Sequence, residues 1–418
     1  MGDIHPYVNL APDPLHEAAV CWIDDREGAD GSQQTLDYDG RSVDITGEAV
    51  PESDYYVYRS VVTGLTADTH YSGTIDNEQS VEWTTLPDSL GEISILVTSD
   101  LHITDQNDQV MTEASDMQAL ADKEPDIMLI AGDLVDLGDT WDEFRAESYL
   151  DWFANYWQHM RDSSSPQLAM VPGNHDVGNH YWTGNPETET VDPEWWIQYF
   201  FEYPQYSNPV GENYGSWELG DYLQILGIDT HSAFPVDVGD WLSGTIDATK
   251  TWCLPFQHSP LLGCGDRDET DIELQERLRN AYSRKLLEAP NVFAFYCGHI
   301  HTRSRTVAWT LPEFPEDKET IPFDDGNGLI QFGEGYAAGR PLNNEWYVDY
   351  NYQEEQFYTF EFTEKAMTVR EYDTNGVEYS ESPTTFNVSD GGDWMLDKRF
   401  IANIGDADLG RVDLGGGA

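Results

Sequence analysis

Five short groups of Asp, Asn and His residues follow one another between residues 100 and 301 of this 418-residue chain. Carboxylate, amide and imidazole side chains of this kind bind metal ions. In Asp-x-His and His-x-His, alternate side chains of an extended segment point to the same side, so both can face one centre. The groups are Asp100-Leu101-His102, Gly132-Asp133-Leu134-Val135-Asp136, Gly173-Asn174-His175-Asp176, Phe256-Gln257-His258-Ser259-Pro260 and Gly298-His299-Ile300-His301.

This combination of side chains suits the hydrolysis of phosphate esters. Two divalent ions about 3.5–4 Å apart hold a hydroxide nucleophile and neutralise the phosphoryl oxygens, with one carboxylate bridging them. Mixed oxygen and imidazole ligands favour Mn, Fe, Zn, Co or Ni, and the residues leave the choice open. Glycines precede Asp133, Asn174 and His299, where they allow the backbone to turn tightly beneath the ions.

The elements that must position these residues form an α/β pattern. Apolar strands are predicted at 93–98, 126–131 and 167–171, and each runs directly into one of the polar groups. Polar residues at the carboxyl ends of strands are typical of sites in α/β sheets. Helical spacing predicts a helix over 110–124, and two further strands are predicted at 357–362 and 367–373.

From about Ile93 to Tyr372 the chain resembles the calcineurin-like metallophosphoesterase family. The resemblance rests on the five groups in this order and on a predicted strand pair at 213–221 and 223–230. It implies a β-sandwich flanked by helices in four layers, αββα. It also implies that Asp133 bridges two metal ions. The ligands implied for the first ion are Asp100, His102, Asp133 and His301, and those for the second are Asp133, Asn174, His258 and His299.

Other roles implied by the resemblance concern catalysis. His175 matches the family's histidine that stabilises the transition state and protonates the leaving oxygen, and Asp136 matches the acid that orients it. Purple acid phosphatases have Tyr at the position of Asp136, so a colourless enzyme is expected. Protein phosphatases have Arg where Leu137 stands. The usual phosphate clamp is therefore absent, and Arg303 or Arg305 is expected to substitute for it.

The first 88 residues are rich in short alternating strands, predicted at 18–23, 55–62 and 80–85. The run from Val62 to Tyr71 resembles fibronectin type III domains and the N-terminal sandwich of purple acid phosphatases. The expected organisation is an all-β, fibronectin-III-like domain at 1–88, the metallophosphoesterase domain at 92–375 and a polar C-terminal extension at 376–418. The sandwich is expected to pack on the catalytic domain or to present it to a protein partner.

Charge is the strongest signal in the composition. The chain has 78 Asp and Glu against 21 Lys and Arg, a formal charge of −57. Such self-repulsion is screened at about 1 M salt, where the Debye length is about 3 Å, so we expect a protein of a halophile's cytoplasm. The charge disfavours binding to nucleic acids or anionic membranes. Neither a signal peptide nor a membrane-spanning segment is expected, and the four cysteines are predicted to be buried thiols.

Two classes of function remain open. The first is an enzyme that hydrolyses phosphate monoesters or diesters through a metal-bound hydroxide. The second is a structural or attachment protein of a larger assembly, such as a virion component, whose metallophosphoesterase domain is degenerate or accessory. The aromatic block at 194–203 is interpreted as helical core, with a substrate-stacking wall as the alternative. No motif includes the remaining histidines, which are interpreted as ordinary polar or core residues: His5, His16, His70, His159, His180 and His231.

Overall fold

The computed structural model describes most of the chain. The described residues are 3–50, 53–103, 114–135, 144–176, 200–201, 214–231, 235–265, 269–306, 329–333, 335, 342, 348–380, 382–388 and 394–396.

The larger of the two main sheets is centred on three parallel strands of buried apolar residues, β9, β10 and β11. Their segments are rich in Ile, Val, Leu and Met, as expected for strands covered on both faces. Antiparallel strands β19 to β22 continue the sheet beside β9 in the order β22-β21-β20-β19-β9-β10-β11. The bounds are Ile93–Thr98 (β9), Ile127–Ala131 (β10), Gln167–Val171 (β11), Phe357–Phe362 (β19), Ala366–Tyr372 (β20), Thr384–Val388 (β21) and Trp394–Leu396 (β22).

A second sheet has seven strands in the order β12-β13-β14-β15-β17-β16-β18. β12 and β13 form the strand pair predicted from the sequence and are antiparallel, whereas β13, β14, β15 and β17 run parallel to one another. The bounds are Gly215–Leu219 (β12), Leu223–Ile228 (β13), Trp252–Gln257 (β14), Ala294–Cys297 (β15), Arg303–Thr306 (β16), Ile330–Gly333 (β17) and Val348–Tyr352 (β18).

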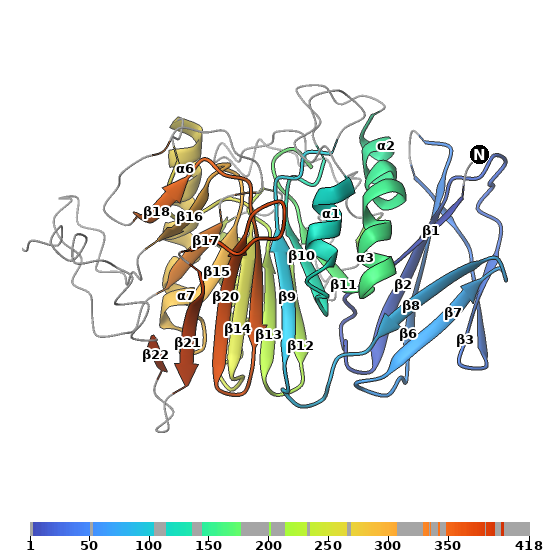
Figure 1. The fold of residues 1–418 in the computed structure, drawn as a ribbon, viewed down its shortest axis with the longest axis horizontal. Helices are drawn as coiled ribbons and strands as arrows, with labels where there is room; N and C mark the ends of the chain where they lie inside the picture. Colours follow the sequence, from blue (N-terminus) through green and yellow to red (C-terminus); the bar gives the residue numbers. More distant parts are fainter. Residues whose placement is uncertain are drawn as a thin grey trace, which may run out of the picture.

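The two sheets pack face to face, and helices cover their outer faces (Figure 1). One apolar core joins Leu129 and Met170 of the first sheet to Trp217 and Phe256 of the second. The layers therefore follow the predicted αββα order. The first helical layer comprises Ala114–Ala121 (α1), Phe144–Asp151 (α2), the π-helical turn Trp152–Tyr156 (η1) and Trp157–Ser163 (α3), and the second comprises Pro235–Thr245 (α5), Glu269–Leu278 (α6), the π-helical turn Arg279–Ser283 (η2) and Arg284–Glu288 (α7).

The N-terminal region is rich in strands and forms sandwich-like sheets, as predicted, at the blue end of the molecule in Figure 1. Its two layers enclose a core that contains Trp22, Tyr58 and Trp83. The strands are Ile4–Asn9 (β1), Glu17–Asp24 (β2), Glu48–Ala49 (β5) and Tyr56–Thr63 (β6) in one layer, and Gln34–Tyr38 (β3), Arg41–Ile45 (β4), His70–Ile75 (β7) and Gln79–Thr84 (β8) in the other.

One layer of this region is continuous with the larger sheet, a link that the sequence did not reveal. β1 lies parallel to β11, with Asn9 opposite Leu168. The amide of Leu10 donates to the carbonyl of Leu168 over 2.8 Å, and the indole of Trp217 donates to the carbonyl of Leu10 over 3.0 Å. The larger sheet therefore extends through β1, β2, β6 and β5 to eleven strands.

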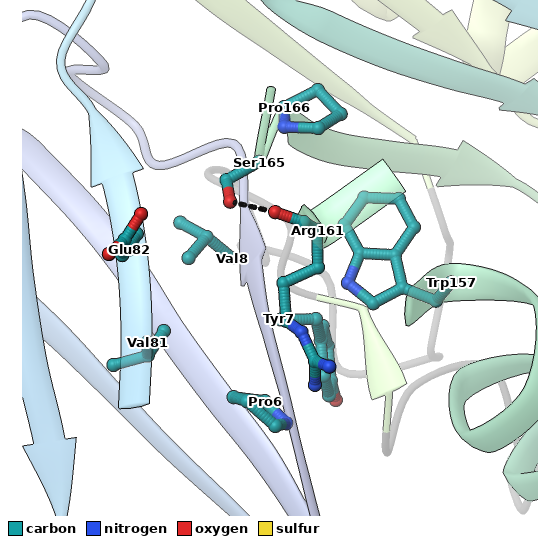
Figure 2. Close-up of a pocket in the computed structure, with 9 residues that line it drawn as sticks. All are labelled: Pro6, Tyr7, Val8, Val81, Glu82, Trp157, Arg161, Ser165 and Pro166. Atoms are coloured by element: carbon teal, nitrogen blue, oxygen red, sulfur yellow. Dashed lines mark hydrogen bonds between the residues drawn. The ribbon is translucent and has the colours of Figure 1, made fainter. Parts of the chain in front are cut away.

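A small pocket lies where β1 and β8 of the N-terminal region meet α3 (Figure 2). Beside it, the hydroxyl of Ser165 donates to the carbonyl of Arg161 over 2.7 Å. The pocket has none of the predicted metal ligands in its wall. Its lining consists of Pro6, Tyr7, Val8, Val81, Glu82, Trp157, Arg161, Ser165 and Pro166.

Other expectations have mixed outcomes. The four cysteines are buried free thiols, as predicted. Residues 376–418 are more than a polar extension, because β21 and β22 lie within them and pair onto β20. Of the aromatic block, the structure describes Phe200 and Phe201, and both are buried in the core. Within the described residues, no helix is long and apolar enough to cross a membrane.

Candidate metal centre

The predicted ligands lie on loops at the carboxyl ends of five parallel strands. Because β9, β10 and β11 are neighbours in one sheet and β14 and β15 in the other, these loops converge at one edge of the sandwich. The loops carry Asp100 and His102 after β9, Asp133 after β10, Asn174 after β11, His258 after β14, and His299 and His301 after β15.

The backbone at this edge adopts a conformation that is unfavourable for residues with a Cβ atom. Asp100, His102, Asp133, His299 and His301 have φ angles of 56°, 47°, 50°, 81° and 59°. Left-handed backbone at non-glycine residues is uncommon and concentrates at functional sites. Hydrogen bonds between the loops hold it: the amide of Asp100 donates to the carbonyl of Gly132 over 3.0 Å, and that of His102 to the carbonyl of Asp133 over 3.1 Å.

Two glycines allow the loops to approach the carboxylates. A Cβ atom at Gly173 would lie 2.1 Å from Oδ1 of Asp133, and one at Gly298 would lie 2.4 Å from Oδ2 of Asp100. Neither position has room for any other residue. The sequence analysis expected these glycines to allow tight turns, and in the structure they allow a close approach to the two carboxylates.

One group of four side chains brings its ligand atoms to within 4.8 Å of one another: Asp100, His102, Asp133 and His301. Nε2 of His301 lies 3.1 Å from Oδ1 of Asp100 and 3.1 Å from Nε2 of His102. Nε2 of His102 lies 3.9 Å from Oδ1 of Asp100 and from Oδ2 of Asp133. Ligands about 2.0–2.2 Å from one ion are about 3 Å apart when adjacent and up to about 4 Å apart when opposite, so this spacing fits a metal ion.

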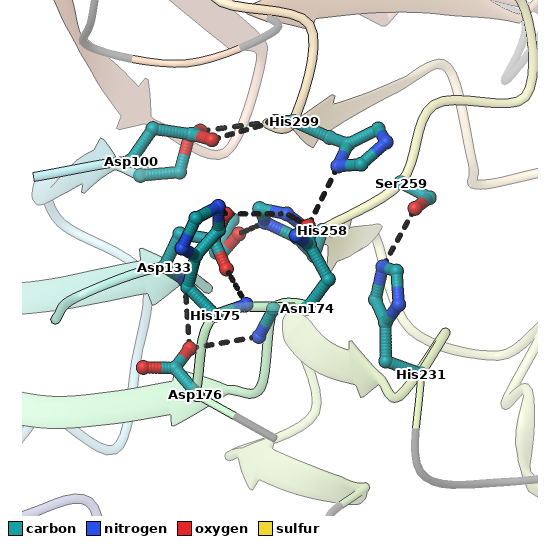
Figure 3. Close-up of polar contacts among 12 residues, drawn as sticks. Asp100, Asp133, Asn174, His175, Asp176, His231, His258, Ser259 and His299 are labelled. Carbon is teal, nitrogen blue, oxygen red and sulfur yellow. Dashed lines mark hydrogen bonds and ion pairs between the residues drawn. The ribbon is translucent and has the colours of Figure 1, made fainter. Parts of the chain in front are cut away.

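A second group of donor atoms lies beside the first (Figure 3). Oδ1 of Asn174 is 2.8 Å from Nδ1 of His299 and 3.1 Å from Nε2 of His258. Nε2 of His258 is in turn 3.2 Å from Oδ2 of Asp133. The same carboxylate oxygen of Asp133 is thus close to donor atoms of both groups.

His231 also lies at this edge, although the sequence analysis gave it no role. It is buried, and its ring, with those of His258 and His299, places three imidazole nitrogens within 4.8 Å of one another. Its Nε2 atom lies 2.7 Å from Oγ of Ser259. No sequence motif includes His231, so only the fold brings it to the site.

The charges of the site are those of a cation-binding cluster. Burial alone would raise the pKa of Asp100, but the charge of His258 and the hydrogen bond from His301 lower it to about 2. Burial would lower the pKa of His258, whereas the charges of Asp133 and Asp100 raise it to about 9. Burial lowers the pKa of His102 to about 4, which leaves this ring neutral, as a metal ligand must be. Two ionised, buried carboxylates need positive charge nearby, and divalent ions would supply it.

Asp176 connects the two loops that carry Asp133 and Gly173, a role that the sequence analysis did not assign. Its Oδ2 atom accepts hydrogen bonds from the amides of Asp133 at 2.7 Å and Gly173 at 2.8 Å. The hydroxyl of Tyr149 donates to Oδ1 over 2.9 Å. Burial and the charge of Asp133 raise the pKa of Asp176 to about 7. Its position in Gly173-Asn174-His175-Asp176 was the available signal, because that group ends in an otherwise unexplained acid.

His175 lies at the margin of the centre. Its amide donates to Oδ1 of Asp133 over 2.8 Å, and its Nε2 atom lies 4.0 Å from Oδ2 of the same residue. Its ring meets that of His102 edge-on, with centroids 4.6 Å apart. The side chain is 24% exposed, so its ring is open to a molecule arriving from solvent. Asp136, its predicted partner, lies outside the described residues.

Both arginines that the sequence analysis named as substrate contacts form ion pairs within the protein. The guanidinium of Arg303 is buried, donates to Glu371 and Glu354 over 3.2 and 2.8 Å, and lies over the ring of Tyr379. Arg305 is also buried and pairs with Asp349. These ion pairs account for the burial of both arginines in β16 without a contact to substrate.

The comparisons with known proteins agree with this geometry. The model of the calcineurin-like phosphoesterase family matches residues 93–303, half of the chain, and the chain belongs to this family. Purple acid phosphatase PPD1 from yellow lupin (Lupinus luteus) seeds is similar over 92% of this chain and 74% of that one, at 14% identity and a TM-score of 0.67. At that identity the likeness shows the fold alone. Together, the family and the donor groups indicate divalent metal ions.

Two further structures have lower similarity. "GAP50 the anchor in the inner membrane complex of Plasmodium" is similar over 75% of this chain and 95% of its own, at 14% identity and a TM-score of 0.44. A predicted phosphoesterase from Streptococcus pneumoniae is similar over 72% of this chain and 99% of its own, at 14% identity and a TM-score of 0.32. No curated protein matches the chain.

Proposed function

We propose that this protein hydrolyses phosphate esters at a dinuclear metal centre. The observation that carries the proposal is the position of Asp133, whose Oδ2 atom lies 3.9 Å from Nε2 of His102 in one donor group and 3.2 Å from Nε2 of His258 in the other. A carboxylate between two groups of ligands is the arrangement that a two-metal hydrolase requires. The first ion is assigned to Asp100, His102, Asp133 and His301, and the second to Asp133, Asn174, His258 and His299.

When bound, the two ions would lower the pKa of water and neutralise the charge of the phosphoryl group. The protein's part is to fix the positions of the ligands. Buried loops with constrained backbone hold Asp100 and Asp133, and Asp176 connects the loops of Asp133 and Gly173. His175 is assigned the transfer of a proton to the leaving oxygen, because its Nε2 atom lies 4.0 Å from Oδ2 of Asp133 and its side chain is 24% exposed.

The proposed substrate is a phosphate monoester or a phosphate diester. Arg303 is left out of the proposed substrate contacts, because its guanidinium is occupied by buried carboxylates. For the domains, we infer that the β-rich region 1–88 packs on the catalytic region 92–375 through β1 and β11.

A screen of phosphate monoesters and diesters in molar KCl, with Mn, Fe, Zn, Co or Ni added separately, tests the proposal. We expect metal-dependent hydrolysis that disappears with a chelator and in the Asp133→Asn variant. Protein that binds two ions yet hydrolyses none of the esters would contradict the proposed activity. Co-purification of such inactive protein with a large particle would instead favour a structural or attachment role.

A further inference from the structure

His299 has a partner on each of its two ring nitrogens. Nδ1 faces the site, 2.8 Å from Oδ1 of Asn174 (Figure 3). Nε2 points the other way and lies 2.8 Å from Oδ1 of Asp271. Asp271 belongs to α6, outside the five sequence groups, and is only 1% exposed.

A carboxylate at this position selects one form of the imidazole ring. An ionised carboxylate only accepts hydrogen bonds, so Nε2 of His299 must carry the proton that it donates to Asp271. Nδ1 then has its lone pair directed at the site. The ring can bind an ion through Nδ1 without losing its contact with Asp271.

His258, the other histidine assigned to the second ion, also has a hydrogen-bond acceptor on one ring nitrogen, but this acceptor is uncharged. Its Nδ1 atom lies 2.8 Å from the carbonyl oxygen of Ala131, which only accepts, and its Nε2 atom faces Asn174 and Asp133. In each ring, therefore, one nitrogen contacts an acceptor outside the site, and the other nitrogen faces Oδ1 of Asn174. The partners differ in charge, because Asp271 adds a negative charge behind His299.

The environment of Asp271 argues for a specific role. On the same helix, the side chain of Glu273 is 69% exposed, as is usual for an acid on the surface of an acidic protein. A carboxylate is costly to bury unless its charge is balanced by hydrogen bonds and nearby positive charge. A hydrogen bond to a ligand of a divalent ion provides both, and metal-binding histidines commonly have such a partner.

We propose that Asp271 is a positioning residue for the second metal ion: its carboxylate fixes the Nε2–H form of His299 and so sets the affinity of that site. The inference rests on the proposed dinuclear centre. It gives α6 an indirect part in metal binding, through the hydrogen bond between Asp271 and the ligand His299.

Calorimetric titration of metal-free protein with Zn²⁺ in molar KCl tests this. Asp271→Ala should weaken the binding of one of two equivalents by about 10- to 100-fold and leave the other near the wild-type value. Asp271→Asn has the same shape and keeps an acceptor for Nε2–H, so it should recover part of that affinity. Glu273→Gln, on the exposed face of α6, is the matched control and should bind both equivalents normally.

Two outcomes would overturn the proposal: unchanged affinity for both equivalents in Asp271→Ala and Asp271→Asn, or equal weakening of both equivalents, which indicates general structural damage. If Asp271→Ala does not fold, Asp271→Asn alone decides, because it must still lower the affinity of a single equivalent. Hydrolysis by the wild type is measured separately. Unchanged binding in the variants of an active enzyme contradicts only the role of Asp271, whereas an inactive wild type with two bound ions contradicts only the proposed activity.

Discussion

Oδ2 of Asp133 lies 3.2 Å from Nε2 of His258, in the interior of the edge where the two sheets meet. The pairing joins a loop of the first sheet to a loop of the second. Both side chains are almost completely buried. The sandwich is therefore connected across its functional edge by charged groups, and a change in either residue alters the charge balance of the whole cluster.

Replacing Asp133 by Asn should remove the bound metal and the activity together. A neutral amide is a poor bridge between two cations, and the loss of a direct ligand should exceed the loss of about 10- to 100-fold in affinity typical of outer partners. Elemental analysis gives the metal content. Asp162→Asn, at an exposed position beside Arg161, is the control and should retain both ions. Retention of two ions by Asp133→Asn contradicts the assignment.

His175→Ala should separate catalysis from metal binding. A general acid contributes about 10²- to 10⁴-fold to turnover, and the variant should lose that much while its metal content stays near wild type. His70→Ala replaces an exposed histidine of β7 and should change neither quantity. A parallel loss of metal from His175→Ala would show that this residue is a ligand.

Gly173→Ala should disrupt the centre by steric conflict. The added Cβ atom would lie 2.1 Å from Oδ1 and 2.5 Å from the amide nitrogen of Asp133, so the loop after β10 must move. We expect a loss of metal and a decrease of about 1–3 kcal/mol in unfolding free energy. Gly244→Ala is the opposite case, since it lies in α5 with nothing within 4 Å of the added atom. It should stabilise the protein by about 0.5–1 kcal/mol.

The sequence predicted the elements whose local pattern was strong. Buried strands such as 93–98 and 167–171 contain continuous apolar runs, and the polar residues at their ends identified the ligand loops. The left-handed backbone of those loops gave no sequence signal beyond the neighbouring glycines. The family resemblance then supplied the pairing of ligands, because spacing along the chain does not determine which loops meet in space.

What the sequence did not reveal depends on contacts between distant segments. Asp271 reaches His299 across 28 positions. Its spacing from Leu274 and Leu278 places it on the buried face of α6, but that spacing does not say which loop it meets. The junction of β1 with β11 joins positions 9 and 168 through backbone hydrogen bonds that any residue type except proline can form. Arg303 was predicted to contact substrate from its nearness to His301 in the chain, but its side chain points toward Glu371.

A buried carboxylate, Asp24, which pairs with the half-buried Arg26 in the N-terminal region, predicts acid sensitivity. Burial alone would raise the pKa of Asp24, but hydrogen bonds from Arg26 and Gln34 and the charge of Arg26 lower it below its ordinary value of 3.8. The carboxylate therefore stabilises the fold above that value, and the contribution is lost as pH falls through the lower, folded pKa. Asp24→Asn should cost about 1.5–3 kcal/mol at pH 6.

Chemical denaturation from pH 6 to pH 2, in molar KCl, measures this difference. The gap between wild type and Asp24→Asn should be constant well above pH 3.8 and should narrow below it. Asp54→Asn, at an exposed position of the same region, should match the wild type at pH 6. A gap that widens as the pH falls would contradict the sign of the shift.

The acidic surface is the remaining feature that needs an explanation. With 78 Asp and Glu against 21 Lys and Arg, most carboxylates have no basic side chain to pair with. Arg26 illustrates the shortage of basic residues, because it pairs with two acids, Asp24 and Glu78. Mutual repulsion among the rest favours the expanded, unfolded chain unless dissolved ions screen it. We propose that the protein is adapted to molar salt.

Lowering KCl from about 1 M to about 0.1 M should therefore loosen the tertiary structure or inactivate the protein, because the Debye length grows from about 3 Å to about 10 Å. Divalent ions should rescue part of the loss, since they screen charge and also bind the folded state at the metal centre. Circular dichroism and activity, followed through a KCl titration, measure the effect, and a chelator separates screening from site binding. An unchanged melting temperature across these salt concentrations, with the chelator present, contradicts adaptation to salt while leaving the metal centre untouched.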